Sequence, residues 1–200
     1  MKSELLTDEM AVGMYRAGFR QILIGFESGH PRILQNMQKR ATREDNTRCV
    51  ELLHEHGIKV KALMSLGHAG ESAETIEATK QWLLDVRPDD FDATIITVYP
   101  GTPYWDETVE TSPQCYTYTA KNGDRLHGQH VDHLSDVNFY KGIPHAYQSF
   151  VHTDYLSADE LVTLRDELED DVRRKLGVAY PTAAAAVQFE KSMGMGMGMR

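Results

Sequence analysis

The chain has 200 residues, of which 41% are hydrophobic, and a formal net charge of −9. This composition allows a buried core in one or two domains. The acidic balance, 30 Asp and Glu against 21 Lys and Arg, excludes the basic surface that non-specific binding to nucleic acids or anionic membranes needs. No apolar run reaches the roughly 18 residues of a membrane span, and residues 1–7 lack a signal-peptide core. We therefore expect a cytoplasmic protein with no nucleic-acid or membrane partner.

Three apolar runs alternate with helical patterns in the first half of the chain. Thr7 is expected to cap a helix that Gly18 ends, and Thr42 a longer helix that Gly57 ends. Runs of this length between turn residues are typical of strands in a parallel sheet. The predicted strands are Ile22–Phe26, Ile58–Leu66 and Ala93–Tyr99; the remaining helices are Pro31–Lys39, a short helix or turn, and one from residue 73 that Pro88 ends.

The first of these runs stops at a carboxylate. Ile22 to Phe26 is nearly continuous in apolar residues, which predicts a strand buried on both faces. A charged side chain is almost never buried unpaired, so Glu27 should lie where the strand leaves the core, at its C-terminal end. Ligands sit at that end in open α/β sheets and in α/β barrels. The alternative is that Glu27 pairs with a loop arginine or caps the next helix.

The pattern changes near residue 107. Residues 112–155 are rich in Tyr, His, Asp and Gly, and Asn122-Gly123 indicates a hairpin in an otherwise irregular segment. Ser157 to Glu160 is a capping box, and leucines at helical spacing predict a helix that ends at Gly177. Residues 166–171 should form a solvated acidic face with i,i+4 pairs to the basic residues that follow. We divide the chain into residues 1–107, an extension over 108–178, and a low-complexity tail over 179–200 that we expect to be disordered.

Three motifs at the strand ends resemble the second half of a radical S-adenosylmethionine barrel. They are GFESG, LGHAGES and YPGTPYW, in this order, and LTDEM and MQKRAT add to the likeness. The resemblance covers residues 5–107 and is strongest for the set as a whole. It extends to the group of these proteins that often carry an N-terminal cobalamin-binding domain. It implies a partial (β/α) barrel with three parallel βα units, followed by the extension.

The resemblance also implies cofactors and the residues beside them. In this superfamily a [4Fe-4S] cluster and S-adenosylmethionine sit at the C-terminal mouth of the strands, and cobalamin is a further cofactor of some members. Glu27 and Ser28 would face the ribose and methionine part of S-adenosylmethionine. The remaining expected positions are Gly67 and Gly70 beside the adenosine, the backbone of Tyr99 and Pro100 beside the adenine, and His30 and His68, which depart from the family pattern, on the substrate side.

The three cysteines of the family's C-x-x-x-C-x-x-C loop are absent from the sequence. Its two cysteines, Cys49 and Cys115, lie far apart and form neither a disulfide framework nor a metal knuckle. Cluster iron needs thiolates, so this chain alone should hold no cluster and be inactive. We expect the partner to be the missing N-terminal half of the barrel or another chain. Without it the first strand keeps an open edge, which favours self-association and marginal stability.

Two other functions compete with this interpretation. One is a non-catalytic half-barrel subunit for binding or assembly. The other is an ordinary (β/α) barrel enzyme whose GHAGES loop cradles phosphate at a helix N-terminus. The substrate, whether a small molecule or a peptide, and the outcome of the reaction are not encoded in any motif.

The extension carries two weaker signals. His127, His130 and His133, with Asp124, Asp132 and Asp136, could bind a metal only in a helix, which Gly128 opposes, so solvated loop histidines are favoured. Asp154, Tyr155 and residues 140–147 would either cover the barrel mouth as a lid or pack beneath the barrel.

Overall fold

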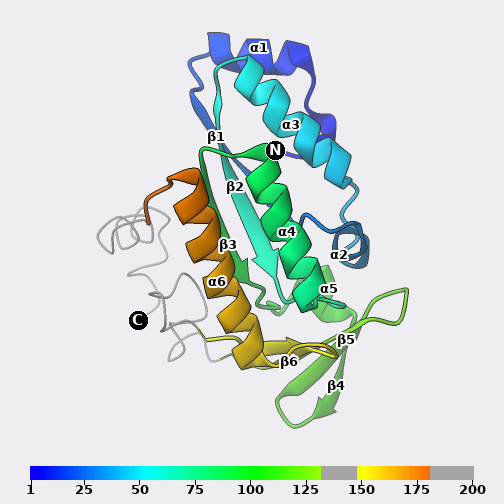
Figure 1. Cartoon of the computed structure of the whole chain (residues 1–200). Helices are drawn as coiled ribbons and strands as arrows, with labels where there is room; N and C mark the ends of the chain where they lie inside the picture. Colours follow the sequence, from blue (N-terminus) through cyan, green and yellow to red (C-terminus); the bar gives the residue numbers. More distant parts are fainter. Residues whose placement is uncertain (132–147, 181–200) are drawn as a thin grey trace, which may run out of the picture.

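The computed structural model describes residues 1–131 and 148–180, which form a parallel and an antiparallel sheet (Figure 1). The parallel sheet has the order β1-β2-β3, and the antiparallel sheet the order β4-β5-β6-β7. The expected α/β fold with three parallel βα units is confirmed. The strands are β1 Gln21–Glu27, β2 Lys59–Leu66, β3 Asp90–Ile95, β4 Thr108–Ser112, β5 Cys115–Thr119, β6 Arg125–Gln129 and β7 Val151–Thr153.

The helices begin at the residues whose side chains can cap them. Thr7 accepts a hydrogen bond from the backbone N–H of Met10, and Thr42, Ser72 and Ser157 each form a capping box. No helix in residues 1–131 or 148–180 has both the length and the apolar character to cross a membrane. The helices are η1 Ser3–Leu5, α1 Asp8–Arg16, α2 Pro31–Asn36, α3 Arg43–Glu55, α4 Ala73–Val86, α5 Pro103–Asp106 and α6 Ala158–Leu176.

Helices cover only one face of the parallel sheet. Figure 1 shows α3, α4 and α6 in front of the three strands. Ile24 and Phe26 of β1 point to this covered face and are buried, whereas Leu23, the residue before Ile24, points to the other face and is 44% exposed. The prediction that this strand is buried on both faces is therefore wrong. We call the other side, which carries Leu23, Gly25 and Glu27 of β1 and Ser65 of β2, the open face.

The third strand lies earlier in the chain than predicted. It runs from Asp90 to Ile95, not from Ala93 to Tyr99, and its pairing with β2 ends where Leu66 lies opposite Ile95. The next residue of β2, Gly67, has a φ of +85° and turns the chain out of the sheet. Ile96 still donates its backbone N–H to the oxygen of Leu66 at 2.9 Å, but β2 ends at that residue, so the pairing does not continue to Tyr99.

The extension is more regular than expected. The Asn-Gly hairpin is confirmed: β5 and β6 pair in an antiparallel fashion around Gly123, whose φ is +92°. The prediction of an otherwise irregular segment is wrong, because β4 and β7 complete a four-stranded sheet. The tail over 181–200 lies outside the described residues.

The antiparallel sheet lies at the C-terminal ends of the parallel strands (Figure 1). Thr153 donates a hydrogen bond from its hydroxyl to the backbone oxygen of Glu71 at 2.8 Å. Tyr118 donates one to the backbone oxygen of Asn36 at 3.2 Å. The antiparallel sheet of the extension therefore lies over the strand ends, whereas α6, the other described part of the extension, packs along β3. Residues 140–147 lie outside the described residues.

The free edge of β3 is closed by charged side chains of α6. Ala93 donates its backbone N–H to Oε1 of Glu169 at 2.7 Å and accepts a hydrogen bond from Nε of Arg165 at 2.8 Å. Arg173 donates to the backbone oxygen of Phe91 and pairs with Glu169. The predicted solvated face is wrong for Glu169, which is 3% exposed, because α6 packs along this edge. The expected i,i+4 pair of Asp171 with Lys175 is present.

The edge of β1 is different. No strand in the described part of the chain pairs with its outer side. Lys39 donates a hydrogen bond to the backbone oxygen of Gly25, and Asn46 donates one to that of Phe26. These two contacts lie at the C-terminal end of the strand, so the outer side of residues 21–23 is left open.

Candidate functional site

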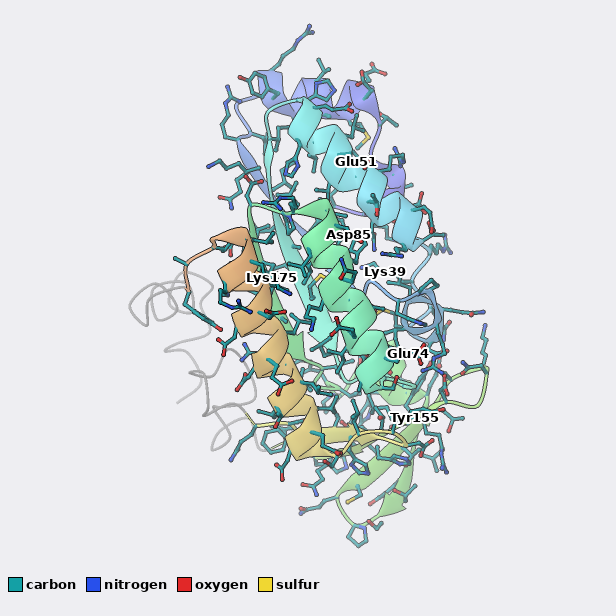
Figure 2. The ribbon with its side chains drawn as sticks, viewed as in Figure 1. Lys39, Glu51, Glu74, Asp85, Tyr155 and Lys175 are labelled. Atoms are coloured by element: carbon teal, nitrogen blue, oxygen red, sulfur yellow. The ribbon has the colours of Figure 1, made fainter. Side chains whose placement is uncertain are left out.

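Three loops meet at the C-terminal end of the parallel sheet, as the motifs predict. They follow β1 at Ser28, β2 at Gly67 and β3 at Ile96. Parallel strands deliver the loops that follow them to one edge, which is where α/β folds bind ligands. Figure 2 labels Glu74, at the start of α4, and Tyr155, beside the antiparallel sheet, at this end of the molecule.

Glu27 stands at a bulge of β1 with a φ of 69°, which is rare for a residue with a side chain. Its carboxylate folds back over the strand, where a Cβ on Gly25 would overlap Oε1. Nζ of Lys39 lies 3.2 Å from the same oxygen. The sequence offered a cofactor contact or an ion pair with an arginine. The structure shows an ion pair, but with a lysine, and it leaves the carboxylate partly exposed on the open face.

Ser28 and His30 serve local structure. Ser28 is fully buried against α4, with its Oγ 3.2 Å from Oγ1 of Thr79, and accepts a hydrogen bond from the backbone N–H of His30. His30 caps α2, its Nδ1 accepting from the backbone N–H of Arg32 at 3.2 Å. Burial and the charge of Arg32 lower the pKa of His30. The hydroxyl of Ser28 is thus already satisfied within the protein.

The glycines of the GHAGES loop are packed by protein atoms. Gly67 and Gly70 both have a φ of +85°. A Cβ on Gly67 would lie 3.1 Å from Ile95, and one on Gly70 would overlap the carboxylate of Asp124. Their conformation and the tight packing of this chain's own elements account for both glycines. Their predicted role beside the adenosine stays a prediction.

Glu71 is a functional candidate that the sequence reasoning did not single out. Its carboxylate is fully buried and accepts hydrogen bonds from the backbone N–H of Gly67 at 3.2 Å and from the hydroxyl of Thr75. Burial raises the pKa of Glu71 to about 7. The carboxylate of Glu71 already accepts the backbone N–H of Gly67, which a phosphate bound in the GHAGES loop would need. This contact argues against the interpretation of the loop as a phosphate-binding site.

His68 lies beside the open face at the end of β2. Its Nε2 is 2.6 Å from Oγ of Ser65, and its ring stands edge-on to that of Tyr104. Burial, with a smaller contribution from the charge of Lys39, lowers the pKa of His68 to about 4. The imidazole is therefore neutral at physiological pH. Its Nδ1 has no hydrogen-bond partner in the described residues.

Tyr99 and Pro100 lie in the loop after β3 and are exposed. The backbone oxygen of Tyr99 accepts a hydrogen bond from the hydroxyl of Thr102 at 2.7 Å. The expected place of their backbone beside the adenine stays a prediction.

The described histidines of the extension do not form a metal site. His127 lies on β6 between Thr117 and Asp154, at 2.9 and 3.0 Å, and His130 packs its ring on Trp105. His127 lies on β6 and His130 directly after it, so the helical arrangement that a metal would need is wrong for this pair. No metal-binding group of three or more such side chains exists among the described residues. Residues 132, 133 and 136 lie outside them.

The cysteines do not fit an iron–sulfur cluster. Cys49 is buried in α3, and burial raises the pKa of its thiol to about 11. Cys115 lies on β5, in the other sheet. Two thiols on separate elements, one of them held protonated, cannot replace the cysteine set that a [4Fe-4S] cluster requires.

A family model described as the Radical SAM superfamily matches residues 2–83. This segment is part of a radical SAM domain. It holds β1, β2 and most of α4, and therefore two of the three strand-end loops. The match thus covers two of the three parallel strands, together with Glu27, Lys39 and His68 near their C-terminal ends.

Curated relatives match about half of the chain. The bacteriochlorophyllide d C-12(1)-methyltransferase of Chlorobaculum tepidum is 33% identical over 93 residues, 46% of this chain and 20% of that protein. The anaerobic magnesium-protoporphyrin IX monomethyl ester cyclase of Rubrivivax gelatinosus is 30% identical over 106 residues, 52% of this chain and 19% of that protein. The chain thus spans about a fifth of the length of these relatives.

Solved radical SAM structures share the fold. TsrM from Kitasatospora setae, a radical S-adenosylmethionine methyltransferase solved with tryptophan and a SAM analog, aligns with 87% of this chain and 35% of its own, at a TM-score of 0.51 and 19% identity. TsrM with cobalamin and a [4Fe-4S] cluster aligns with 61% of this chain and 26% of its own, at a TM-score of 0.50 and 23% identity. These likenesses support the half barrel and the antiparallel sheet as one fold.

Proposed function

We propose that the chain supplies part of the S-adenosylmethionine-binding barrel of a radical SAM enzyme that performs radical or methyl-transfer chemistry. One observation carries the proposal: the segment that matches the family brings its motif loops to one end of a parallel sheet, where Glu27 and Ser65 lie on the open face. Methyltransferase and cyclase relatives support the reaction class.

The residues on the open face suit S-adenosylmethionine better than they suit the cluster. Glu27 offers a partly exposed carboxylate, and Lys39 an ammonium beside it. Such groups bind the hydroxyls and the amino-acid part of this cofactor. S-adenosylmethionine supplies the methyl group or the radical when it is bound. The part played by this chain is to orient it at the strand ends.

The cluster must be held elsewhere in the whole protein, because the two cysteines of this chain do not fit it. We propose that the missing cysteines come from a preceding half barrel or from a partner chain that joins at β1. The structure of TsrM contains cobalamin. We propose cobalamin as a further cofactor of the whole protein on the basis of this likeness.

Two measurements on the 200-residue chain test this function. After reconstitution with iron and sulfide we expect no stable [4Fe-4S] absorption and no cleavage of S-adenosylmethionine above background. In an NMR titration we expect S-adenosylmethionine to shift the signals of Glu27 and His68, and phosphate to leave the amides of 67–72 unchanged.

The opposite results would separate the alternatives. Reductive cleavage by the chain alone would refute the claim that it is incompetent. Saturable phosphate shifts in the GHAGES loop would favour the ordinary barrel enzyme. No response to S-adenosylmethionine, together with capture of a protein partner, would favour the non-catalytic subunit.

A further inference from the structure

The GHAGES loop between β2 and α4, residues 67–72, is held by side chains from other parts of the chain. A loop has no neighbouring strand to satisfy its backbone groups, yet buried carbonyl groups need a hydrogen-bond donor. Three consecutive carbonyl oxygens of this loop each accept from one side chain of α2 or β7. The pairs are Ala69 with Asn36, Gly70 with Arg32 and Glu71 with Thr153, each at 2.8 Å. These donors therefore fix the shape of the loop.

Asp124 holds the two donors of α2 in place. It ends the turn between β5 and β6, which Figure 1 shows on the side of the molecule where α2 lies. Its Oδ2 accepts a hydrogen bond from Asn36 at 2.8 Å and lies 3.9 Å from Nε of Arg32. Tyr155, in the link between β7 and α6, donates to its Oδ1 at 3.3 Å. One carboxylate of the extension thus connects both donors to the antiparallel sheet.

The same carboxylate packs directly on the loop. Gly70 has a φ of +85°, and a Cβ at this position would overlap the carboxylate of Asp124 and the amide nitrogen of Asn36. Only a glycine lets the loop and the turn come this close. The side chain of Asp124 is 12% exposed, so protein atoms surround most of it. The loop is therefore held by direct contact with Asp124 as well as by the two donors.

We propose that Asp124 is a positioning residue, which fixes the GHAGES loop through Asn36 and Arg32 in the conformation that binds S-adenosylmethionine. This inference rests on the proposed function and deepens it. In a planar trans peptide the N–H points away from the preceding C=O, so the donors of α2 also set the direction of the N–H groups of Gly70 and Glu71.

The position of Asp124 in the chain gives the extension a part in the binding site. Asp124 lies outside residues 2–83, which match the family model. The loop that it holds lies inside them. The antiparallel sheet is therefore more than a cover over the strand ends, because the conformation of a family motif depends on one of its residues.

The test compares loop conformation and affinity in the 200-residue chain. The first readout is the set of amide NMR signals of residues 67–71 without ligand, and the second is the dissociation constant of S-adenosylmethionine. In Asp124→Ala we expect these signals to move. We expect the affinity to fall about tenfold, as for the loss of one hydrogen bond to a charged group.

Matched variants separate positioning from simple loss of stability. Glu110 is an exposed carboxylate on β4 of the same sheet, so Glu110→Gln should change neither readout. Glu169→Ala weakens the closed edge of β3 without touching the loop, and it should lower the urea midpoint but leave the affinity unchanged. Asp124→Asn keeps an oxygen for Asn36 but loses the charge that faces Arg32, so its affinity should lie between those of Asp124→Ala and the unsubstituted chain.

Two results would overturn the inference. One is that Asp124→Ala leaves the loop signals and the affinity unchanged. The other is that Glu169→Ala weakens binding as much, because stability alone would then account for the loss. If Asp124→Ala does not fold, Arg32→Met decides in its place, since it removes the donor to Gly70 and should move the same signals and weaken binding.

The proposed function is judged separately. If the unsubstituted chain does not bind S-adenosylmethionine, the proposed function is refuted, and the loop signals of Asp124→Ala then decide whether Asp124 holds the loop. Binding by the unsubstituted chain that Asp124→Ala does not weaken would refute the role of Asp124 alone.

Discussion

The two edges of the parallel sheet are finished in different ways. At β3, a helix from the end of the chain places Arg165, Glu169 and Arg173 against the backbone groups of Phe91 and Ala93. At β1, single side chains reach only the C-terminal end of the strand. The buried charged side chains of α6 make the hydrogen bonds that a neighbouring strand would make to β3. No further strand can therefore pair with this edge of the sheet.

This difference determines at which edge of the parallel sheet another strand can add. A fourth parallel strand can add only where backbone groups are unpaired, which is along residues 21–23 of β1. It would leave the ladder near Gly25, whose backbone oxygen is already bonded to Lys39. The added strand would therefore diverge beside Glu27, at the end where the motif loops meet.

Removing the buried carboxylate should damage the closed edge most. Glu169→Ala removes the carboxylate that pairs with Arg173 and leaves the buried backbone N–H of Ala93 without its acceptor. Arg173 keeps its contact with Asp90 and Arg165 keeps Asp166, so the free energy of unfolding should fall by about 3 kcal/mol, the low end for a broken buried ion pair. Urea denaturation measures the change. Glu167, two residues before Glu169 and exposed on the opposite side of α6, provides the control, and Glu167→Ala should cost less than about 0.5 kcal/mol. Equal losses in the two variants would show that the edge contacts contribute little.

Glu71 contrasts with Glu169, because it is a buried carboxylate with no ion pair among the described residues. Its folded pKa, about 7, lies above the usual value of a glutamate, so the folded state binds the proton more tightly than the unfolded state does. Its contribution to stability is full below about pH 4.3 and is lost as the pH rises to about 7, a change on the order of 3 kcal/mol.

Glu71→Gln should remove this dependence of the free energy of unfolding on pH. We expect its urea midpoint to vary less between pH 4.5 and 7 than that of the unsubstituted chain, since the amide does not titrate. Carboxylates whose pKa is lowered in the fold, such as Asp154, stabilise the folded state more as the pH rises, and they do so at lower pH than Glu71. These carboxylates are present in both proteins, so they do not affect the comparison. Parallel pH profiles would contradict the assignment of a near-neutral pKa to Glu71.

The smallest expected effect concerns the open edge. We expect the isolated chain to self-associate through β1, and Leu23→Lys to raise the apparent dissociation constant about tenfold, or ~1.4 kcal/mol, because a charge on an edge strand opposes pairing. Sizing chromatography with light scattering measures this. Val109 on β4 is also exposed, and a larger effect from Val109→Lys would place the association at the other sheet.

The local features of the fold could be predicted from the sequence. Thr42 and Ser157 cap their helices, and Asn122-Gly123 forms its hairpin, because each depends on residues within a few positions. β4 and β7 were missed, since short polar strands show no alternation and gain their stability from pairing. The burial of Glu169 was also missed, because its partner Ala93 lies 76 positions away.

The candidate site could be predicted only in outline. The motifs placed the loops at the same end of the sheet, and Glu27 at the end of its strand. Neither Lys39 as its partner nor Glu71 as a buried acid follows from periodicity, because both depend on how loops distant in sequence pack. Gly25, two residues before Glu27, was the available signal for a carboxylate that folds back.

The closure of β3 by α6 also has a consequence during synthesis. The strand leaves the ribosome well before the helix that satisfies its edge, since Ala93 precedes Glu169 by 76 positions. At typical rates of translation that interval is roughly 4–15 s. During this time the outer edge of β3 has unpaired backbone groups, so chaperones that recognise extended chains would find their target in residues 90–95 until α6 emerges.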